Sequence, residues 1–423
     1  MKVAFTSFVL FLWSCNSYTQ IIKDPTYFKD IGKISSFSWA PARYQNDFRY
    51  DIFYYIPESL REKNHVNSLI FMHGGGGSTL TRSGSIAAVK LYIEDFKKIA
   101  DALGIIVVLP STNGLNWGGH TRGILRNLAE LMRTNLNINS NKLGLAGHSM
   151  GAMGITRAYP WIADEFAFFM PMAAGMDLGM PSSDPIILEK IESYLNKVFN
   201  VSYVHLQGKF DHFREFVPRC EDQVKRTKKL ELKYRAPSKL EMILHQGSHN
   251  YDFGLMKNTL KRLYTNVTRN LYQKKLWGLI HTVQSTKTEN QNISYNYDSE
   301  ARYFWIEAIE PELSIEERIN FHASIINNNI DINIIGNMPK QNKKLRIYLH
   351  SSMVDLKSDS FIFINGKQVG VRFGNTEHQE PRNLDPKDPS FLFEDFIDVE
   401  IDVENSTNFT FTELQQLAFS LKQ

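Results

Sequence analysis

The sequence predicts an α/β protein with a mostly parallel sheet flanked by helices, followed by a small all-β domain of the sandwich kind. Between residues 68 and 268, short apolar runs alternate with helix-length amphipathic segments, a pattern typical of a parallel sheet covered on both faces. After about Leu276 the helical patterns stop and closely spaced strand patterns follow. The 423 residues also exceed the size at which one hydrophobic core usually stops growing. We therefore expect two domains, at residues 20–276 and 277–423.

The first 19 residues have the order of an export signal. Lys2 supplies a positive start, Val3 to Trp13 form a short apolar run, and small and polar residues follow. The run is too short to span a bilayer, and no later stretch is long and apolar enough for a membrane helix. We expect a secreted or periplasmic protein without an integral membrane segment. Cys15 leaves lipoprotein anchoring open as an alternative, because residues 12–15 loosely resemble a lipoprotein cleavage site.

The first domain is predicted to begin with an antiparallel strand over Phe48–Ile56, where residues alternate and aromatic side chains are frequent. The parallel strands that follow are predicted at Ser68–Met72, Ile105–Leu109, Leu143–Ala146, Phe166–Met172, Ser202–Leu206 and Leu240–Leu244. The helices between and after them are predicted at Leu91–Leu103, Gly123–Leu136, Ala152–Tyr159, Ile186–Phe199, Arg219–Lys233 and Gly254–Thr268. The connections between parallel strands should be right-handed crossovers.

The second domain is expected to consist of short strands joined by tight turns. Asn365-Gly366 lies between two strand patterns, which is a strong signal for a two-residue hairpin. The predicted strands are Arg302–Glu307, Arg318–Ile326, Asn329–Ile335, Lys344–His350, Ser360–Ile364, Gln368–Val371 and part of Phe391–Val403. Such closely spaced strands favour a small β-sandwich as an accessory domain.

The composition excludes several classes of protein. Hydrophobic residues make up 43% and charged residues 22%, which excludes disorder, collagen and coiled coil as readings of the whole chain. The net charge of +3 gives no electrostatic case for a nucleic-acid partner. Of the two cysteines, Cys220 has no intrachain partner once Cys15 is removed with the signal. Its neighbours Glu221 and Asp222 would raise a thiol pKa, so we expect a buried or incidental cysteine. The sequence does not indicate an oligomeric state.

The strongest motif is Gly147-His148-Ser149-Met150-Gly151. It follows an apolar strand and precedes a helix-prone segment, the strand-turn-helix setting in which a serine hydroxyl is lifted above a sheet as a nucleophile. A second glycine-rich run, from His73 to Ser78, directly follows another strand. Glycine lets backbone N–H groups approach an oxygen closely, so we expect Gly74, Gly75, Gly76 and Met150 to form an oxyanion hole. The run lacks the spacing of a phosphate-binding loop.

A nucleophilic serine needs a base, and the base needs an orienting acid. His249 is the strongest candidate base, because it lies in a loop after the predicted strand Leu240–Leu244 and before a helix; His245 is closer to the strand and is expected to be structural. The acid should lie in the loop after the preceding strand, which makes Asp211 the candidate, with Glu215 and Asp177 in reserve. The other histidines after Ser149 are His205, His212, His281 and His322.

The order Ser149, Asp211, His249 and the Gly-His-Ser-Met-Gly elbow resemble the α/β-hydrolase superfamily. More narrowly, Tyr50 to Thr268 is similar to the secreted esterase branch that holds feruloyl esterases, polyhydroxybutyrate-depolymerase-like enzymes and related peptidases. The resemblance implies ester hydrolysis through an acyl-serine intermediate. Two departures prevent the substrate from being carried over: Ala152 follows Gly151 where many relatives have a second glycine, and the paired cysteines of the fungal enzymes are absent.

Candidate substrate-binding residues are Trp117, His120 and His148. The loop of residues 116–120 follows the strand that ends at Leu109, on the edge of the sheet where ligands bind. Trp117 either supplies a platform for an acyl or sugar group or packs under the loop. We predict no metal and no cofactor, because the chain has neither a His-Glu-x-x-His pattern nor clustered cysteines.

Together these residues predict a serine hydrolase acting on small-molecule or polymeric carboxylic esters, carbohydrate-linked esters and polyesters included. Three alternatives stay open. An acyltransferase or a peptidase would use the same Ser149, His249 and Asp211, whereas a non-catalytic surface-binding protein would use none of them. A complete set of nucleophile, acid and base in the expected order counts against the last alternative.

Overall fold

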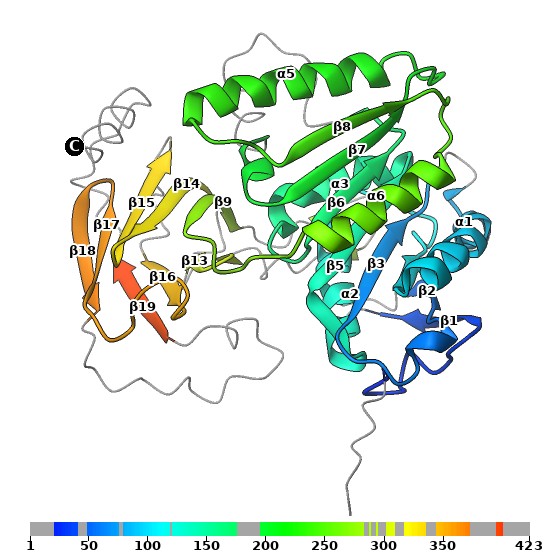
Figure 1. Cartoon of the computed structure of the whole chain (residues 1–423), viewed down its shortest axis with the longest axis horizontal. Coiled ribbons are helices and arrows are strands. Elements are labelled where there is room, and N and C mark those ends of the chain that lie inside the picture. Colours follow the sequence, from blue (N-terminus) through cyan, green and yellow to red (C-terminus); the bar gives the residue numbers. More distant parts are fainter. Residues whose placement is uncertain are drawn as a thin grey trace, which may run out of the picture.

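The computed structural model describes residues 21–40, 49–75, 79–118, 121–175, 195–282, 287–288, 293–294, 302–308, 317–335, 344–372 and 395–400. These residues form an α/β body, at the right of Figure 1, and a β-rich region beside it. The predicted export signal at residues 1–19, with Cys15, lies outside the described residues. No helix in the described part of the chain is long and apolar enough to cross a membrane.

The body is built on an eight-stranded sheet with the strand order β1-β2-β4-β3-β5-β6-β7-β8. The pairs β1–β2 and β2–β4 are antiparallel, and the neighbours from β4–β3 to β7–β8 are parallel. An antiparallel start followed by this parallel order is the α/β-hydrolase fold, so the predicted fold class is confirmed. The strands are β1 (Ile34–Trp39), β2 (Tyr50–Tyr55), β3 (Val66–Met72), β4 (Ile106–Pro110), β5 (Ile138–His148), β6 (Phe168–Met172), β7 (Ser202–Gly208) and β8 (Leu240–His245).

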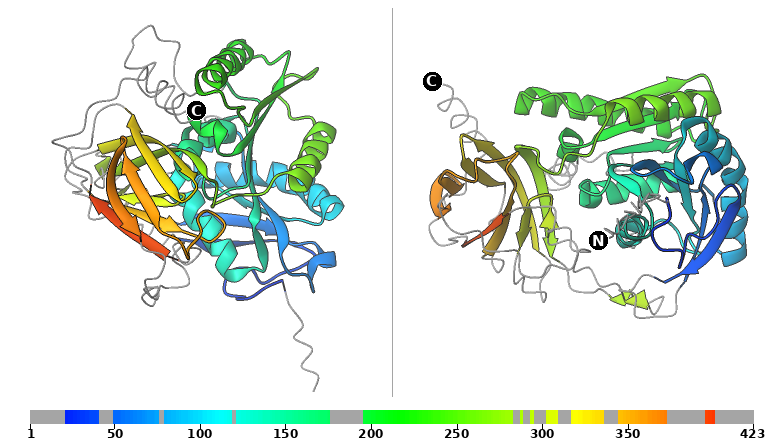
Figure 2. Two further views of the ribbon diagram at one scale, coloured as in Figure 1. Left: turned by 60° about the vertical axis from the view of Figure 1, so that its left-hand side comes forward. Right: turned by 60° about the horizontal axis from the view of Figure 1, so that its bottom comes forward.

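Helices cover both faces of this sheet (Figure 2). Phe96 of α1 and Leu260 of α6 join Phe71 of β3 in one buried cluster, whereas Ile155 of α3 joins Ile70 in the other. Neighbouring residues of β3 therefore face opposite helical layers, which is why residues 69–72 of the strand are apolar without interruption. The described helices of the body are α1 (Arg82–Leu103), α2 (Thr121–Asn135), α3 (Met150–Ile162), α5 (Phe216–Tyr234) and α6 (Phe253–Asn266), with the short 3-10 turns η1 (Glu58–Leu60) and η3 (Asn196–Phe199).

The β-rich region has the expected sandwich-like form. A five-stranded sheet of order β18-β17-β15-β14-β9 contacts a four-stranded sheet of order β12-β13-β16-β19. The predicted hairpin at Asn365-Gly366 joins β17 to β18. We propose β9 as the start of this domain. Its strands are β9 (Lys275–Thr282), β10 (Lys287–Thr288), β11 (Ile293–Ser294), β12 (Arg302–Tyr303), β13 (Ile306–Ala308), β14 (Glu317–Ile326), β15 (Asn329–Ile335), β16 (Lys344–Leu349), β17 (Ser360–Ile364), β18 (Lys367–Arg372) and β19 (Asp395–Glu400).

Two predicted elements differ in the structure. The single strand expected at Arg302–Glu307 is broken into β12 and β13, because Phe304 has a φ of 55° and Trp305 turns to donate its indole N–H to the Gln273 carbonyl at 3.1 Å. The helix expected at Ile186–Phe199 falls largely outside the described residues, and its described end is the 3-10 turn η3.

The body and the β-rich region share one buried junction. Asn200, which follows η3, donates from Nδ2 to the Trp277 carbonyl at 2.7 Å and to the Tyr303 hydroxyl at 3.1 Å. Its Oδ1 accepts from the Trp277 backbone N–H at 3.0 Å. Lys197 is fully buried beside it and donates from Nζ to the Gly278 carbonyl at 3.0 Å. A single hydrophobic cluster continues across the junction, so each part completes the core of the other.

Replacing Asn200 with alanine is expected to lower the free energy of unfolding by about 2–4 kcal/mol. The change leaves the N–H and the carbonyl of Trp277 without their partner, and each buried unsatisfied group costs about 1–3 kcal/mol. Chemical denaturation of the full chain measures the effect. Asn266→Ala is the matched control, because Asn266 is exposed and such surface changes usually stay within about 0.5 kcal/mol. Equal stabilities of the two variants would contradict the assigned role of Asn200.

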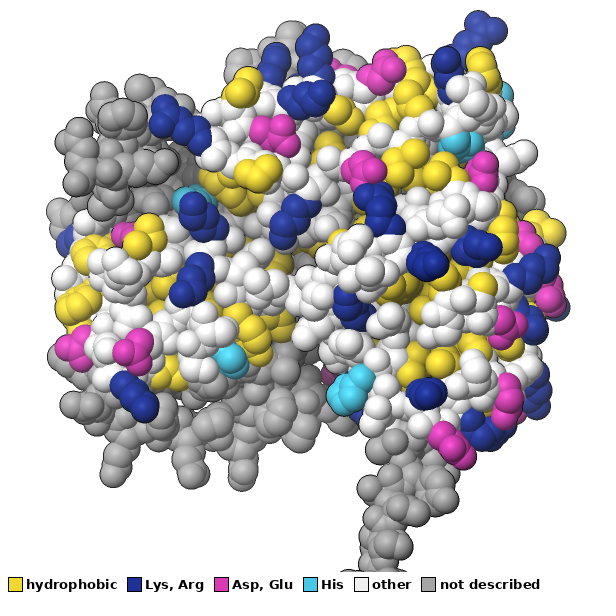
Figure 3. All heavy atoms as spheres, in the orientation of Figure 1, with side chains coloured by type: hydrophobic (Ala, Val, Ile, Leu, Met, Phe, Trp, Pro, Cys, Tyr) yellow, Lys and Arg dark blue, Asp and Glu magenta, His cyan; other side chains and the backbone are white. Residues whose placement is uncertain are grey.

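Charged side chains of both signs are interspersed over the face of the molecule in Figure 3, with apolar side chains between them. Single exposed apolar residues are ordinary on a protein surface. Two of them are placed where they matter for the site: Phe210 is 62% exposed and Phe213 is 41% exposed. Both lie in the loop between β7 and α5, on either side of Asp211.

Candidate active site

Ser149 lies in the turn between β5 and α3, the strand-turn-helix setting expected from its motif. Its backbone has φ 52° and ψ −116°, and a positive φ is uncommon for a residue other than glycine. The turn also approaches β3 closely, because a Cβ added at Gly151 would lie 2.2 Å from the Met72 carbonyl oxygen. Glycine at this position therefore permits the tight turn that holds the serine at the end of the sheet.

His249 lies in the loop between β8 and α6, and its Nε2 is 2.8 Å from the Ser149 Oγ. This is within the reach that a general base needs. The imidazole is flanked by aromatic rings, with ring-centroid distances of 4.8 Å to Phe213 and 6.0 Å to Phe216. Its side chain is only 16% exposed, so the ring is packed on its sides while Nε2 faces the serine.

Asp211 lies in the loop that follows β7, and its two carboxylate oxygens are 3.0 and 3.1 Å from the Nδ1 of His249. The carboxylate is fully buried and also accepts hydrogen bonds from Gln207 Nε2 at 2.8 Å and from the Phe213 backbone N–H at 2.9 Å. Burial acts to raise the pKa of Asp211, but the hydrogen bonds from His249, Phe213 and Gln207 outweigh it and hold the pKa below its usual 3.8. The carboxylate is therefore ionised at neutral pH.

These contacts determine which nitrogen of His249 carries the proton. An ionised carboxylate only accepts hydrogen bonds, so Nδ1 donates to Asp211 and Nε2 presents its lone pair to the Ser149 hydroxyl. In this arrangement the imidazole can remove the serine proton, and the carboxylate can stabilise the imidazolium that forms. The structure thus brings together the three side chains that the sequence singled out as nucleophile, base and acid.

The reserve candidates lie elsewhere. Glu215 is exposed at the start of α5, and Asp177 lies outside the described residues. His245 accepts the Gly247 N–H at its Nδ1, 3.1 Å away, in keeping with the structural role expected of it. His205 is fully buried, and its Nε2 is 3.4 Å from the Sγ of Cys220, which is itself buried.

The structure narrows the set of backbone N–H groups that are candidates for the oxyanion hole. Met150 is the first residue of α3, where a backbone N–H has no carbonyl partner within the helix. The Gly74 N–H has the Tyr92 hydroxyl as a hydrogen-bond partner, so it is less available to an oxyanion than the other predicted donors. Gly76 lies outside the described residues. Gly75 and Met150 remain the candidates among the residues that the structure describes.

His148 does not have the surroundings expected of a substrate-binding residue. It is 8% exposed. Its Nε2 is 2.7 Å from the backbone oxygen of His249, and its Nδ1 is 2.8 Å from the Tyr92 hydroxyl. Burial lowers the pKa of His148 to about 4, so the ring is neutral at pH 7. Both nitrogens are engaged within the protein, which corrects the prediction that this ring contacts substrate.

Trp117 is also buried, at 1% exposure, and the prediction that it forms a substrate platform is wrong. Its indole N–H donates to the His73 carbonyl at 3.0 Å, and its ring lies 5.3 Å from the His73 ring. Of the two readings of this residue, packing under the loop is the one that the structure supports. His120 lies outside the described residues.

Sequence reasoning missed the aromatic residues that surround the base. Phe213 and Phe216 stack with ring centroids 5.0 Å apart, and His212 lies 4.8 Å from the His249 ring. On the other side, Tyr92 and Tyr251 contact His148. The concentration of aromatic residues between 210 and 216, around the predicted acid, was an available signal. No comparable local signal pointed to Tyr92.

Asp211, His212 and His249 each offer a ligand atom within 4.8 Å of the others, which raises the question of a metal site. The Asp211 carboxylate is buried and already accepts from three donors. Both nitrogens of His249 are also engaged. An ion would have to displace the contact between Asp211 and His249, so the geometry favours the hydrogen-bonded arrangement at these residues.

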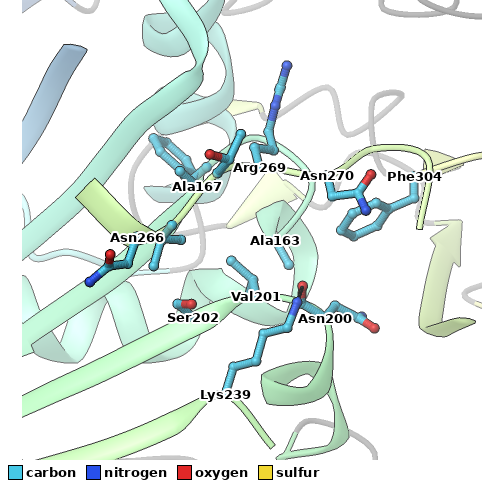
Figure 4. Close-up of a pocket in the computed structure, with 13 residues that line it drawn as sticks. Ala163, Ala167, Asn200, Val201, Ser202, Lys239, Asn266, Arg269, Asn270 and Phe304 are labelled. Carbon is cyan, nitrogen blue, oxygen red and sulfur yellow. Dashed lines mark hydrogen bonds between the residues drawn. The ribbon is translucent and has the colours of Figure 1, made fainter. Parts of the chain in front are cut away.

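A cavity of about 170 Å³ lies away from these residues, where the body meets the β-rich region (Figure 4). Asn200, Lys239 and Phe304 are among the residues that line it, and the Lys239 Nζ donates to the Asn200 carbonyl at 2.8 Å. It also includes Ala167 and Ser202, at the starts of β6 and β7. Ser149 follows the end of β5, at the opposite edge of the parallel sheet, so this cavity is not the reaction site.

No protein-family model and no curated protein matches the chain. Solved structures similar to it include a thermostable esterase, at 13% identity, with 56% of this chain and 64% of that chain covered and a TM-score of 0.39. A ferulic acid esterase has 16% identity, coverage of 55% and 97%, and a TM-score of 0.39. An S-formylglutathione hydrolase from Agrobacterium tumefaciens has 15% identity, coverage of 55% and 95%, and a TM-score of 0.41. The chain thus spans 64% of the length of the first of these.

Proposed function

We propose that this protein is a serine hydrolase that cleaves carboxylic esters through an acyl-serine intermediate. The observation that carries the proposal is the continuous set of contacts from Ser149 Oγ to His249 Nε2 and from His249 Nδ1 to Asp211, at 2.8 and 3.0 Å. The three residues come from loops after β5, β8 and β7, which all end at the same edge of the sheet. From the export signal predicted at residues 1–19, we propose in addition that the enzyme works outside the cytoplasm.

In the acylation step, Ser149 Oγ attacks the ester carbonyl carbon while its proton passes to His249 Nε2. The carbonyl oxygen becomes an oxyanion, and the backbone N–H groups of Gly75 and Met150 are the donors assigned to it. When the tetrahedral intermediate collapses, the C–O bond to the alcohol breaks and His249 returns the proton to the leaving oxygen. Asp211 stays ionised and stabilises the imidazolium between the two proton transfers.

In the second step, water replaces the departed alcohol. His249 Nε2 takes a proton from this water as it attacks the acyl carbon, and the proton then returns to Ser149 Oγ as the acid is released. Phe210 and Phe213 flank Asp211 in the loop after β7, and both are exposed. They are apolar side chains that could shield an acyl group on Ser149 from water. We propose that these side chains face the bound ester, whether it is a small molecule, a carbohydrate-linked ester or a polyester.

A fluorophosphonate probe tests the proposal, because it reacts with a serine that a neighbouring base has activated. We expect the full chain to be labelled, and peptide mapping to place the adduct on Ser149. Hydrolysis of p-nitrophenyl esters but not of the matching p-nitroanilides would separate ester from peptide cleavage. Absence of labelling in protein shown to be folded by circular dichroism would overturn the proposed function.

A further inference from the structure

We propose that Tyr92 and His148 are positioning residues, which hold the backbone of His249 through a chain of hydrogen bonds that begins at residues 73–75, called the oxyanion loop below. This inference rests on the proposed function, because it concerns the base of that reaction. Neither side chain touches the Ser149 hydroxyl in the contacts described above. Their action would pass through the main chain of His249, whereas Asp211 contacts its side chain.

The chain of hydrogen bonds joins three segments that are far apart in sequence. Gly74, directly after β3 and His73, donates its N–H to the Tyr92 hydroxyl on α1. The Tyr92 hydroxyl is 2.8 Å from the Nδ1 of His148, at the end of β5. The Nε2 of His148 is 2.7 Å from the backbone oxygen of His249, in the loop before α6. The oxyanion loop and the base loop are thereby connected through two side chains.

The direction of each hydrogen bond follows from the groups involved. A backbone carbonyl only accepts, so the Nε2 of His148 carries the proton and donates to His249. The ring is neutral at pH 7, as its lowered pKa requires, and its Nδ1 therefore accepts. The Tyr92 hydroxyl donates to that Nδ1 and accepts from Gly74. If the direction of one of these hydrogen bonds were reversed, two acceptors or two donors would face each other. The chain of hydrogen bonds therefore specifies a single tautomer of His148.

The packing around His148 leaves little freedom for another arrangement. A Cβ added at Gly74 would lie 2.7 Å from the Tyr92 hydroxyl and 2.8 Å from the His148 Nδ1, so the close approach needs glycine there. The rings of Tyr92, Tyr251 and His249 lie 5.8, 5.5 and 5.3 Å from the His148 ring. His148 can therefore act as a rigid link between α1 and the loop of the base.

Such a link matters because proton transfer depends on the distance between His249 Nε2 and the Ser149 hydroxyl. The side chain of His249 is oriented by Asp211, but its main chain belongs to a loop. A displacement of about 1 Å at a reacting group can cost about 100-fold in rate. Losing one hydrogen bond of the chain should leave the triad in place on average and widen its range of positions. The expected effect is on kcat, with substrate binding unchanged.

The test compares Tyr92→Phe, which removes only the hydroxyl, with Tyr251→Phe. Tyr251 packs against the same His148 ring, but its hydroxyl donates to Asp95 at 2.9 Å and lies outside the chain. A second comparison uses His148→Gln, whose amide offers one donor and one acceptor, and His148→Leu, which offers neither. The measurements are kcat and KM on a p-nitrophenyl ester, the second-order rate of fluorophosphonate labelling, and the melting temperature of the full chain.

Tyr92→Phe is expected to lower kcat and the labelling rate about tenfold, which corresponds to about 1.4 kcal/mol, and to leave KM within about twofold. Tyr251→Phe should keep kcat within about twofold at a similar melting temperature. His148→Gln should retain more activity than His148→Leu. Equal kcat values for the two tyrosine variants, or a glutamine variant no better than the leucine variant, would overturn the inference. Failure of the wild-type protein to be labelled would instead overturn the proposed function.

Discussion

Replacing Ser149 with alanine is expected to lower the rate of ester hydrolysis by about 10⁴-fold or more, which is the scale of losing the nucleophile of such a triad. The change removes only the Oγ that lies 2.8 Å from His249, so no acyl intermediate can form and fluorophosphonate labelling should disappear. The melting temperature should change little, because alanine keeps the same backbone turn. The values of kcat/KM and the labelled fraction are the measurements.

Ser83→Ala is the matched control, because Ser83 is exposed in the first turn of α1. It should retain the activity of the wild type. A double variant with His249→Ala should lose no more activity than Ser149→Ala alone, since residues that act as a unit are not additive. If the Ser149→Ala protein kept more than a tenth of the wild-type rate of ester hydrolysis, Ser149 would not be the nucleophile.

Replacing Asp211 with asparagine is expected to lower kcat by about 10⁴-fold. Asp211 accepts from His249, Gln207 and the Phe213 N–H, and an amide cannot accept on both of its arms. The His249 ring would then accept at Nδ1 and carry its proton on Nε2, where it cannot take the serine proton. Folding should be largely kept, because the two side chains have nearly the same shape. Steady-state kinetics on a p-nitrophenyl ester measure the loss.

Glu215→Gln supplies the matched control for this substitution. It changes a carboxylate to an amide in the same loop region, at an exposed position at the start of α5. We expect wild-type kcat from it. If both variants were equally active, Asp211 would not be the orienting acid, and the buried hydrogen bonds to it would serve the loop structure alone.

The main features of the fold could be predicted because they depend on patterns within single segments. A central parallel strand is buried on both faces, so β4, β6 and residues 69–72 of β3 are apolar without interruption. Ser149 and Asp211 were found in the same way, since each follows the end of such a strand, and His249 follows the apolar residues of the partly buried edge strand β8. The edge strand β1 was missed, because its Ile-Ser-Ser-Phe-Ser-Trp sequence mixes polar and apolar residues and is only partly buried.

Features that depend on the direction of a side chain could not be predicted. Sequence position placed Trp117 and His148 near the nucleophile, but not which way each ring points, and both turn into the protein. The contact of Tyr92 with His148 joins residues 56 positions apart, and the contact of His148 with His249 spans 101 positions. A single sequence contains no local pattern that marks such pairs, because they arise only when separate loops meet.

The junction between the body and the β-rich region has a consequence for how the chain is made. Asn200 belongs to the body, but its partner Tyr303 comes 103 residues later. A ribosome adds about 5–20 residues per second, so Tyr303 is made roughly 5–20 s after Asn200. Without the β-rich region, Asn200 and the apolar residues of the junction lack their partners. The body therefore acquires its final stability only after the β-rich region has folded against it.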